Sequence, residues 1–489
     1  MNVQGNSKIK GVLTCALLAL FPSQLFSQAE VDSASVNGSD DLTIDYFTIL
    51  SNPTPDDCAD CPDNGQQSMV RRTSNEPCIR RQPMQTEFAN RLGGEKQGEL
   101  IFSGLRPVCI TAGANVSYLI PMDAQCRAIM HNCGASAYLL SVSFRPDAVG
   151  AQAIDIDYGL PSFEVGLQMG DYHHIQLWRK EPALPYHSRI GRLLTLYGGF
   201  RRDLFRNDGG RWRIGYTLEN GIGYCTHPYN KHTNADNEIV GSAWNIYIDL
   251  GFYAAIKVAP QWEIGFGVDY KHYSNSALDR PNKGANNIGL TARASYLLTP
   301  DAPPLHSLKS TEEFKTRVYV DIAAGLAGKS LLDDWMVNYW ERTPDDPKYR
   351  SSHFPIYGAF TCMVAPMWRY CRRYASGIGI DYTYAPYSDR LQRLDISRGR
   401  TNYSYSRHVI GVTLRHEVFW RRISLGMGIG WYAHRKMGYT ADVDEKPYYE
   451  TVGVRYTPPI WNDRLYIGYQ VKAHFTKADC MQLLAGVRL

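Results

Sequence analysis

The sequence predicts an all-β protein, a transmembrane antiparallel β-barrel of about 14–16 strands. Two observations lead to this prediction. Apolar and polar residues alternate in long segments toward the C-terminus, and tyrosine and glycine are abundant, with 33 and 42 residues. In such barrels every second residue of a strand faces lipid, and aromatic side chains gather at the two membrane interfaces. No apolar stretch in the mature chain is long enough to form a transmembrane helix.

The first 29 residues have the organisation of a secretory signal peptide. Lys8 and Lys10 form a short basic region, an apolar run follows, and small residues surround the predicted cleavage near Ser27 or Ala29. The apolar run is too short to cross a bilayer as a helix. We therefore expect the chain to be exported and the barrel to lie in the cell outer membrane.

Residues 30–110 are expected to form a poorly structured N-terminal extension. The segment contains prolines, acidic pairs and arginine pairs, and it has little sustained apolar alternation. Cys58 and Cys61 have the spacing of a redox or metal-binding pair, but no matching second pair follows them. A structural disulfide or two unpaired thiols are therefore favoured, and we assign no chemistry to the extension.

The predicted barrel occupies residues 111–489, and its strands alternate between an apolar face and a face of polar residues or glycine. Residues two apart on a strand share a face, so the pattern predicts one face toward lipid and one toward the lumen. A soluble β-sandwich is the alternative, but its strands would be shorter and would lack aromatics at both ends of the apolar face. The clearest strands are 211–224, 244–258, 422–434, 464–475 and 480–489.

A potential base and a potential nucleophile lie two residues apart at the end of the predicted strand 261–275. Phe266 and Val268 belong to the apolar set of this strand, and His272 and Ser274 continue the same set. Two polar side chains at the end of a lipid-facing set of residues indicate a functional role at the membrane surface.

The next predicted strand, 286–298, supplies a third polar residue after a hairpin loop that contains proline and glycine. Its first residue, Asn286, belongs to the apolar set, whereas Asn287 belongs to the lumenal set. Cross-strand neighbours on one face lie within about 5 Å of each other. We therefore expect Asn286, and not Asn287, to lie beside His272.

These three residues form a set suited to ester hydrolysis. Ser274 would attack the ester carbonyl, His272 would accept its proton, and Asn286 would orient the imidazole through its other nitrogen. Asn275, Asn282 or backbone amides of the loop would donate hydrogen bonds to the oxyanion. This chemistry uses no metal and no cofactor. On spacing alone, the alternative is a group of interfacial polar residues without a catalytic role.

The motif His-Tyr-Ser-Asn at 272–275, followed by Pro-Asn-Lys-Gly at 281–284, resembles the lipid A 3-O-deacylase family of the PagL type. Related acyloxyacyl hydrolases occur in Bacteroidetes-like bacteria. The runs 230–242 and 472–479 also resemble this branch. The resemblance implies an outer-membrane serine esterase that removes the 3-O-linked acyl chain from lipid A or a related acylated glycolipid. Its partner would be lipopolysaccharide in the outer leaflet.

The resemblance also implies residue roles. His272 and Ser274 match the base and the nucleophile of the family, and Asn275 and Asn282 match residues near its oxyanion region. The best-known members have a glutamate where this chain has Asn286. A neutral amide orients a histidine but stabilises imidazolium less than a carboxylate does. We therefore expect a hydrolase whose activity is reduced by this change.

Other polar residues are weaker candidates. Asp279 lies in the hairpin loop and is an alternative source of the missing carboxylate. His173, His174, His227 and His232 are isolated in the sequence from paired carboxylate or cysteine ligands. We interpret these histidines as surface or loop residues.

The length and charge of the chain restrict its remaining properties. Small members of the family end soon after the motif, whereas this chain continues for about 190 residues, which predicts a barrel of more than eight strands. The formal net charge of +4 is small for 489 residues and argues against a nucleic-acid partner. A homo-oligomer is compatible with the sequence. The alternative to the esterase is a catalytically silent outer-membrane barrel, either a porin-like channel or a structural surface protein.

Overall fold

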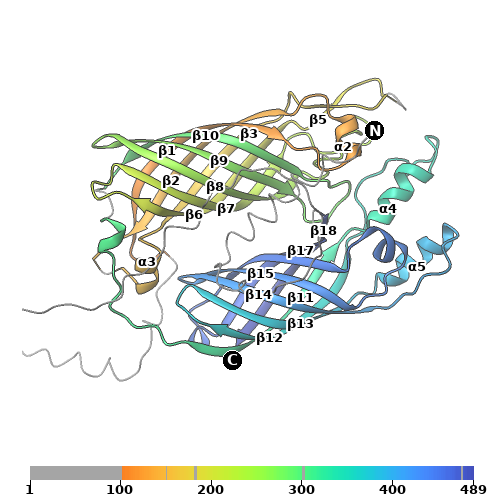
Figure 1. The fold of residues 1–489 in the computed structure, drawn as a ribbon. Helices are drawn as coiled ribbons and strands as arrows, with labels where there is room; N and C mark the ends of the chain where they lie inside the picture. The colour runs from red at the N-terminus through yellow and green to blue at the C-terminus, as the bar shows by residue number, and fades with distance from the viewer. Residues whose placement is uncertain (1–101, 150, 181–183, 300–302, 475–476) are drawn as a thin grey trace, which may run out of the picture. The chain divides into compact units, whose positions relative to one another are not determined.

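The fold consists of two closed antiparallel β-barrels of eight strands each (Figure 1). It is seen in a computed structural model that describes residues 102–149, 151–180, 184–299, 303–474 and 477–489. The predicted signal peptide, residues 30–101 of the predicted extension, and Cys58 and Cys61 lie outside the described residues.

The first barrel closes in the order β1-β10-β9-β8-β7-β6-β3-β2, so β1 pairs with both β10 and β2. Two short strands, β4 (Gln176–Leu177) and β5 (Ser188–Arg189), pair in the connection between β3 and β6. The barrel strands are β1 (Leu105–Leu119), β2 (Gly134–Pro146), β3 (Ser162–Asp171), β6 (Arg192–Arg206), β7 (Trp212–Cys225), β8 (Trp244–Ala259), β9 (Trp262–Ser274) and β10 (Ala285–Leu297).

The second barrel contains the strands β11 to β18 in sequence order, and β11 pairs with β18 to close it. Each strand therefore pairs with its neighbours in the sequence, which is the simplest topology for an antiparallel barrel. The strands are β11 (Arg317–Lys329), β12 (Tyr357–Arg369), β13 (Tyr374–Tyr384), β14 (His408–Trp420), β15 (Ile423–His434), β16 (Tyr448–Tyr456), β17 (Leu465–His474) and β18 (Lys477–Arg488).

The helices are short and lie in the connections between strands. α4 and α5 lie beyond the strand ends of the second barrel (Figure 1). No helix among the described residues is long and apolar enough to cross a membrane. The helices are α2 (Ala124–Ile129), α3 (Ala153–Asp157), η3 (Leu305–Ser307), α4 (Leu332–Met336), η4 (Val337–Glu341), α5 (Ser388–Ser397), η5 (Thr440–Asp444) and η6 (Trp461–Asp463).

The prediction of an all-β antiparallel barrel is confirmed, and the two sets of eight strands together match the predicted total of about 14–16. We expected one enlarged barrel across residues 111–489, but the strands close into two separate barrels. The chain closes one barrel by pairing β10 with β1, and then starts a second with β11. Period-two alternation does not reveal this division, because an outward apolar face looks the same in one wide barrel and in two narrow ones.

Side chains alternate between the inside and the outside of each barrel, as the sequence pattern predicts. The interior of the first barrel contains buried ion pairs, such as Arg293 with Glu164 at 3.2 Å and with Glu219 at 3.0 Å. In the second barrel, Arg455 pairs with Asp321 at 3.0 Å. Eight-stranded barrels have interiors just wide enough for side chains to fill. The described side chains fill most of the two interiors in this way, and many of the opposite charges there are paired.

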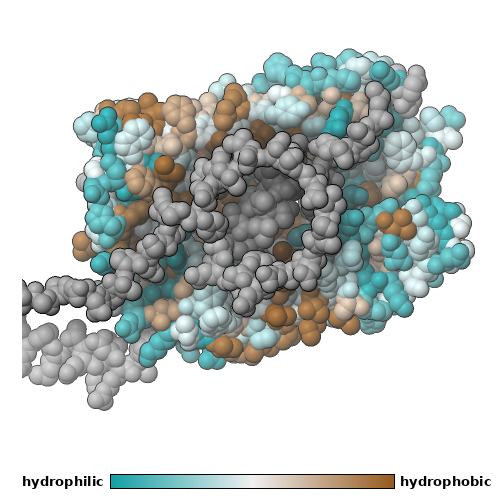
Figure 2. Space-filling model, in the orientation of Figure 1, coloured by the Kyte–Doolittle hydropathy of each residue, from teal (hydrophilic) through white to brown (hydrophobic). Residues whose placement is uncertain are grey.

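The outer faces of the barrels are apolar. Phe266 and Leu290, in the middle of β9 and β10, are 63% and 62% exposed. Figure 2 shows hydrophobic residues on the flanks of the barrels and mainly hydrophilic residues at the end where the loops gather. The aromatic pair Tyr224–Trp244 lies at one end of the first barrel and the pair Trp262–Tyr296 at the other. Apolar surfaces of this extent are unfavourable in water and suit contact with lipid.

We predict that Leu290→Arg destabilises the protein in lipid vesicles by about 2–4 kcal/mol, because a charge would replace an apolar side chain at mid-strand on the outer face. Val149→Arg is the control, since Val149 is 89% exposed in a connection outside the strands. The measurement is the free energy of unfolding in urea with the protein in vesicles. Equal effects of the two changes would contradict a lipid-facing position for Leu290.

Candidate active site

The predicted site lies at the end of β9 and the beginning of β10, where the two strands leave the barrel. The alternation of β9 places His272 and Ser274 in the outward set, and Tyr273 between them points inward. Tyr273 is fully buried and its hydroxyl contacts Gln168 at 2.8 Å and Thr195 at 3.0 Å. The inward tyrosine thus anchors the strand end that carries the two outward residues.

The register of β9 and β10 aligns Asn286 directly with His272, and Asn287 with Lys271. The His272 Nδ1–Asn286 Oδ1 distance is 2.8 Å. An amide oxygen only accepts hydrogen bonds, so Nδ1 of His272 carries the proton and donates it. This leaves Nε2 unprotonated in the neutral ring, which is the tautomer that a general base requires.

Asn286 is itself held on both sides of its amide. The Tyr270 hydroxyl donates to Asn286 Oδ1 at 2.7 Å, and Asn286 Nδ2 donates to the Gly284 carbonyl at 3.2 Å. These two contacts fix which end of the amide faces His272. Tyr270 therefore helps to orient the Asn286 amide. Its role was not predicted from the sequence, although Tyr270 belongs to the same outward set as His272 and could have been identified in this way.

The hydroxyl of Ser274 is bonded to the loop rather than to His272. Ser274 Oγ accepts hydrogen bonds from Asn282 Nδ2 at 3.0 Å and from the Ser276 backbone N–H at 3.1 Å. Ser274 is 5% exposed, so the predicted nucleophile is largely enclosed by protein. Catalytic hydrogen bonds are often long or unformed in ligand-free structures and tighten when substrate binds.

The loop between the strands has a strained backbone at the point where it approaches Ser274. Ser276 and Ala277 have φ of 54° and 65°, in the left-handed region that residues with a side chain seldom adopt. This conformation turns the Ser276 N–H toward Ser274 Oγ. Strain of this kind gathers at functional sites, where the surrounding structure holds it.

The side chain of Asn275 stabilises the same loop. Its Nδ2 donates to Ser242 Oγ at 3.0 Å and to the Asp279 carbonyl at 3.3 Å. Its backbone N–H donates to Asn282 Oδ1 at 3.3 Å. Of the two predicted supporting residues, Asn282 therefore contacts Ser274 directly, whereas Asn275 contacts Asn282 and the loop.

Residues 226–243 hold this loop from one side. The backbone N–H groups of Lys283 and Gly284 donate to the carbonyls of Glu238 and Ile239 at 3.0 and 2.9 Å. A Cβ on Gly241 would lie 1.6 Å from the Pro281 carbonyl oxygen, so only glycine fits there. The run 230–242, noted in the sequence for its resemblance, thus packs against the loop that carries Asn282.

Ion pairs strengthen this contact. Lys283 Nζ lies 3.0 Å from Asp123 and 3.4 Å from Glu238, and Arg179 pairs with Glu238 and Asp236. Burial opposes the charge on Lys283, but the carboxylates of Glu238 and Asp123 outweigh it and raise the pKa of the ammonium. Arg179, Glu238 and Lys283 were not found by sequence reasoning, because nothing in their spacing indicates that three separate loops meet.

The alternative acid and the other histidines lie in different surroundings. Asp279 accepts from the Arg280 backbone N–H at 2.8 Å and pairs with His353 at 3.4 Å. His173 pairs with Asp171 at 2.6 Å. Within the described part of the chain, the side chain that holds the imidazole of His272 is the amide of Asn286.

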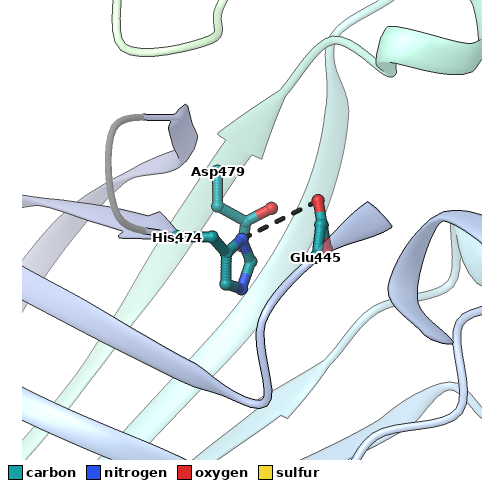
Figure 3. A group of neighbouring side chains, drawn as sticks. All are labelled: Glu445, His474 and Asp479. Atoms are coloured by element: carbon teal, nitrogen blue, oxygen red, sulfur yellow. Dashed lines mark ion pairs between the residues drawn. The ribbon is translucent and has the colours of Figure 1, made fainter. Parts of the chain in front are cut away.

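A separate cluster in the second barrel has the spacing of metal ligands. Glu445, His474 and Asp479 point toward one another (Figure 3), with one ligand atom from each within 4.8 Å of the others. Lys329 contacts Asp479 and Arg435 contacts Glu445, so each carboxylate already has a cationic partner from the protein. The run 472–479, noted in the sequence, supplies His474 and Asp479 of this cluster.

Comparisons with known proteins agree with the division into two barrels. The family model for lipid A 3-O-deacylase (PagL) matches residues 178–295. The family model for the C-terminal domain of acyloxyacyl hydrolase matches residues 319–489, which span the second barrel. No curated protein matches the chain.

Solved structures that match include several mutants of the porin of Rhodopseudomonas blastica. Two of these share 6% sequence identity with the chain, cover 79% of it and 100% of their own length, and superpose with a TM-score of 0.14. A score this low supports no conclusion about fold or function. The two family matches fall on the two barrels, and the chain belongs to the PagL-type family of lipid A 3-O-deacylases.

Proposed function

We propose that the protein is an outer-membrane serine esterase that removes the 3-O-linked acyl chain from lipid A or a related acylated glycolipid. The observation that carries this proposal is the 2.8 Å contact between His272 Nδ1 and Asn286 Oδ1, two residues from Ser274 on the same outward set. The apolar outer face supports a membrane location, and family membership supports the lipid substrate. A site at the rim of that face would meet ester groups at the boundary between acyl chains and headgroups.

In the proposed mechanism, His272 Nε2 accepts the proton of Ser274 as its oxygen attacks the ester carbonyl. The carbonyl oxygen becomes an oxyanion beside Ser274 Oγ. Asn282 Nδ2 and the Ser276 N–H, which donate to Oγ in the free protein, are near enough to turn to this oxyanion and would stabilise it. His272 then returns the proton to the sugar oxygen as the C–O bond breaks. Water, deprotonated by His272, attacks the acyl-enzyme. His272 then gives that proton to Ser274 Oγ as the bond between Oγ and the acyl carbon breaks, which releases the fatty acid and free Ser274.

Asn286 supplies orientation in this mechanism but no charge. Its oxygen accepts from both His272 and Tyr270, which keeps the imidazole in place through the catalytic cycle. A carboxylate at this place would also stabilise the imidazolium that forms after proton transfer. We therefore propose an enzyme that is active but slower than relatives with a carboxylate.

We predict that Ser274→Ala and His272→Ala each lower deacylation by at least about 10³-fold, because each removes a member of the catalytic pair. Mass spectrometry of lipid A acyl chains measures the loss. Ser307→Ala is the control, since Ser307 is exposed in a connection between the barrels. If wild type and both variants give identical lipid A, the protein is a catalytically silent barrel, and ion conductance would then identify a channel.

Asn286→Leu is predicted to lower kcat by about 10²–10⁴-fold, because the acceptor that selects the His272 tautomer is lost. Asn286→Asp keeps the shape and adds a charge, so we expect kcat to rise by about five- to tenfold through stabilisation of the imidazolium. Steady-state kinetics in micelles would compare kcat of the purified wild type, Asn286→Leu and Asn286→Asp proteins. A lower rate in the aspartate variant would mean that the site depends on the Asn286 Nδ2 contact with Gly284.

Lys283→Met is predicted to lower kcat by about tenfold or more, because the loop that carries Asn282 would lose its ion pairs with Asp123 and Glu238. Lys283→Arg should restore most of the rate. Lys231→Met is the matched control, since Lys231 Nζ donates to the Pro347 carbonyl at the surface and pairs with no carboxylate among the described residues. A rate that is equally low in the methionine and arginine variants would contradict a role through charge.

A further inference from the structure

The mouth of the second barrel contains a cavity of about 310 Å³. Its walls come from strand ends of the second barrel, among them those of β11, β12, β17 and β18, and from the connection that follows β11. Arg280, Asn282 and Lys283 of the β9–β10 loop also line it. Because Asn282 donates to Ser274 Oγ, one residue connects the cavity to the proposed nucleophile.

Most charges around the cavity are already paired. Lys329 contacts Asp479, and Arg435 contacts Glu445. His474 Nε2 lies 2.7 Å from the Tyr432 hydroxyl, and His474 Nδ1 pairs with Glu445 at 3.8 Å (Figure 3). This network neutralises the acids that a negatively charged ligand would otherwise meet.

Lys472 is a cation left over from this pairing. It is 6% exposed and lines the cavity, yet no described residue gives it a carboxylate within 4 Å or a hydrogen bond to its Nζ. Its ammonium lies 3.9 Å from the ring centre of Tyr449 and 4.7 Å from that of Tyr432. Cation–π contacts compensate only part of the cost of removing an ammonium from water. An anion bound in the cavity would compensate the remaining part of this free-energy cost.

Arg280 is a second such cation. Its Nε and Nη2 donate to the Ser330 carbonyl, both at 3.3 Å, and no carboxylate among the described residues lies within 4 Å of its guanidinium. Guanidinium groups suit phosphate because two parallel N–H donors match two oxygens. Arg280 and Lys472 come from different barrels and line the same cavity.

We propose that this cavity binds a phosphate group on the sugar headgroup of the lipid substrate, with Lys472 and Arg280 as the binding cations. The inference rests on the proposed function, since lipid A is a phosphorylated glucosamine disaccharide. Two cations that have no carboxylate partner among the described residues match the charge of a phosphate monoester. The volume exceeds that of phosphate alone, which leaves room for a sugar ring. The second barrel would then recognise the headgroup while Ser274 meets the ester.

The test is calorimetric binding to the full-length protein in detergent micelles, with glucosamine 1-phosphate, glucosamine and inorganic phosphate as probes. We expect glucosamine 1-phosphate to bind at least about tenfold more tightly than either other probe. Lys472→Met and Arg280→Met should each weaken its binding by about tenfold or more, and Lys472→Arg should retain it. Lys446→Met is the matched control, since Lys446 is exposed near Glu445 and does not line the cavity.

Several results would overturn this inference. Equal binding of glucosamine with and without phosphate would exclude phosphate recognition, and tighter binding of inorganic phosphate would indicate a site for the free ion. An effect of Lys472→Met no larger than that of Lys446→Met would exclude Lys472. Because binding is measured without catalysis, phosphate-dependent binding together with absent deacylation would contradict the proposed function and leave the cavity assignment standing.

A kinetic experiment on the wild-type activity adds an independent measure. Lys472→Met should raise KM for phosphorylated lipid A by about tenfold and leave kcat, and the KM for dephosphorylated lipid A, near the wild-type values. If Lys472 had only a structural role, its substitution would change the KM for both substrates equally, and that result would contradict the proposal. The folded state of each variant is checked by its β-sheet circular dichroism.

Discussion

Closure of each barrel by backbone hydrogen bonds is the constraint on which the rest of the structure depends. β1 pairs with β10, and β11 pairs with β18, so the barrel strands have no free edge. In a lipid environment each unpaired backbone group is costly, which makes closed barrels one of only two structures that can span a membrane. Closure also fixes which residues face outward, because a slip of one residue would turn every side chain to the other face.

The candidate site follows from this register. The ladder between β9 and β10 places Asn286 opposite His272, and the inward Tyr273 holds the strand end in position. What the strands cannot supply comes from the loops, since Asn282 and the Ser276 N–H reach Ser274 only through a strained turn. A rigid scaffold that positions functional loops is common in proteins.

The second barrel extends this arrangement. Its interior has paired charges at mid-barrel, and its mouth has a cavity where Lys472 and Arg280 have no carboxylate partner among the described residues. Buried charges are usually paired, so unpaired ones are informative about ligands.

The sequence by itself determined the fold class and the outward set that contains His272, Ser274 and Asn286, because side chains of a strand alternate with a period of two. It also indicated Asn282, through its resemblance to a family motif. Only the tertiary structure decided that the strands close into two barrels, since the alternation of apolar and polar residues does not show which strands pair to close a barrel. It likewise brought together Lys283 with Glu238, and Arg280 with Lys472, because contacts between distant loops leave no periodic trace in a sequence.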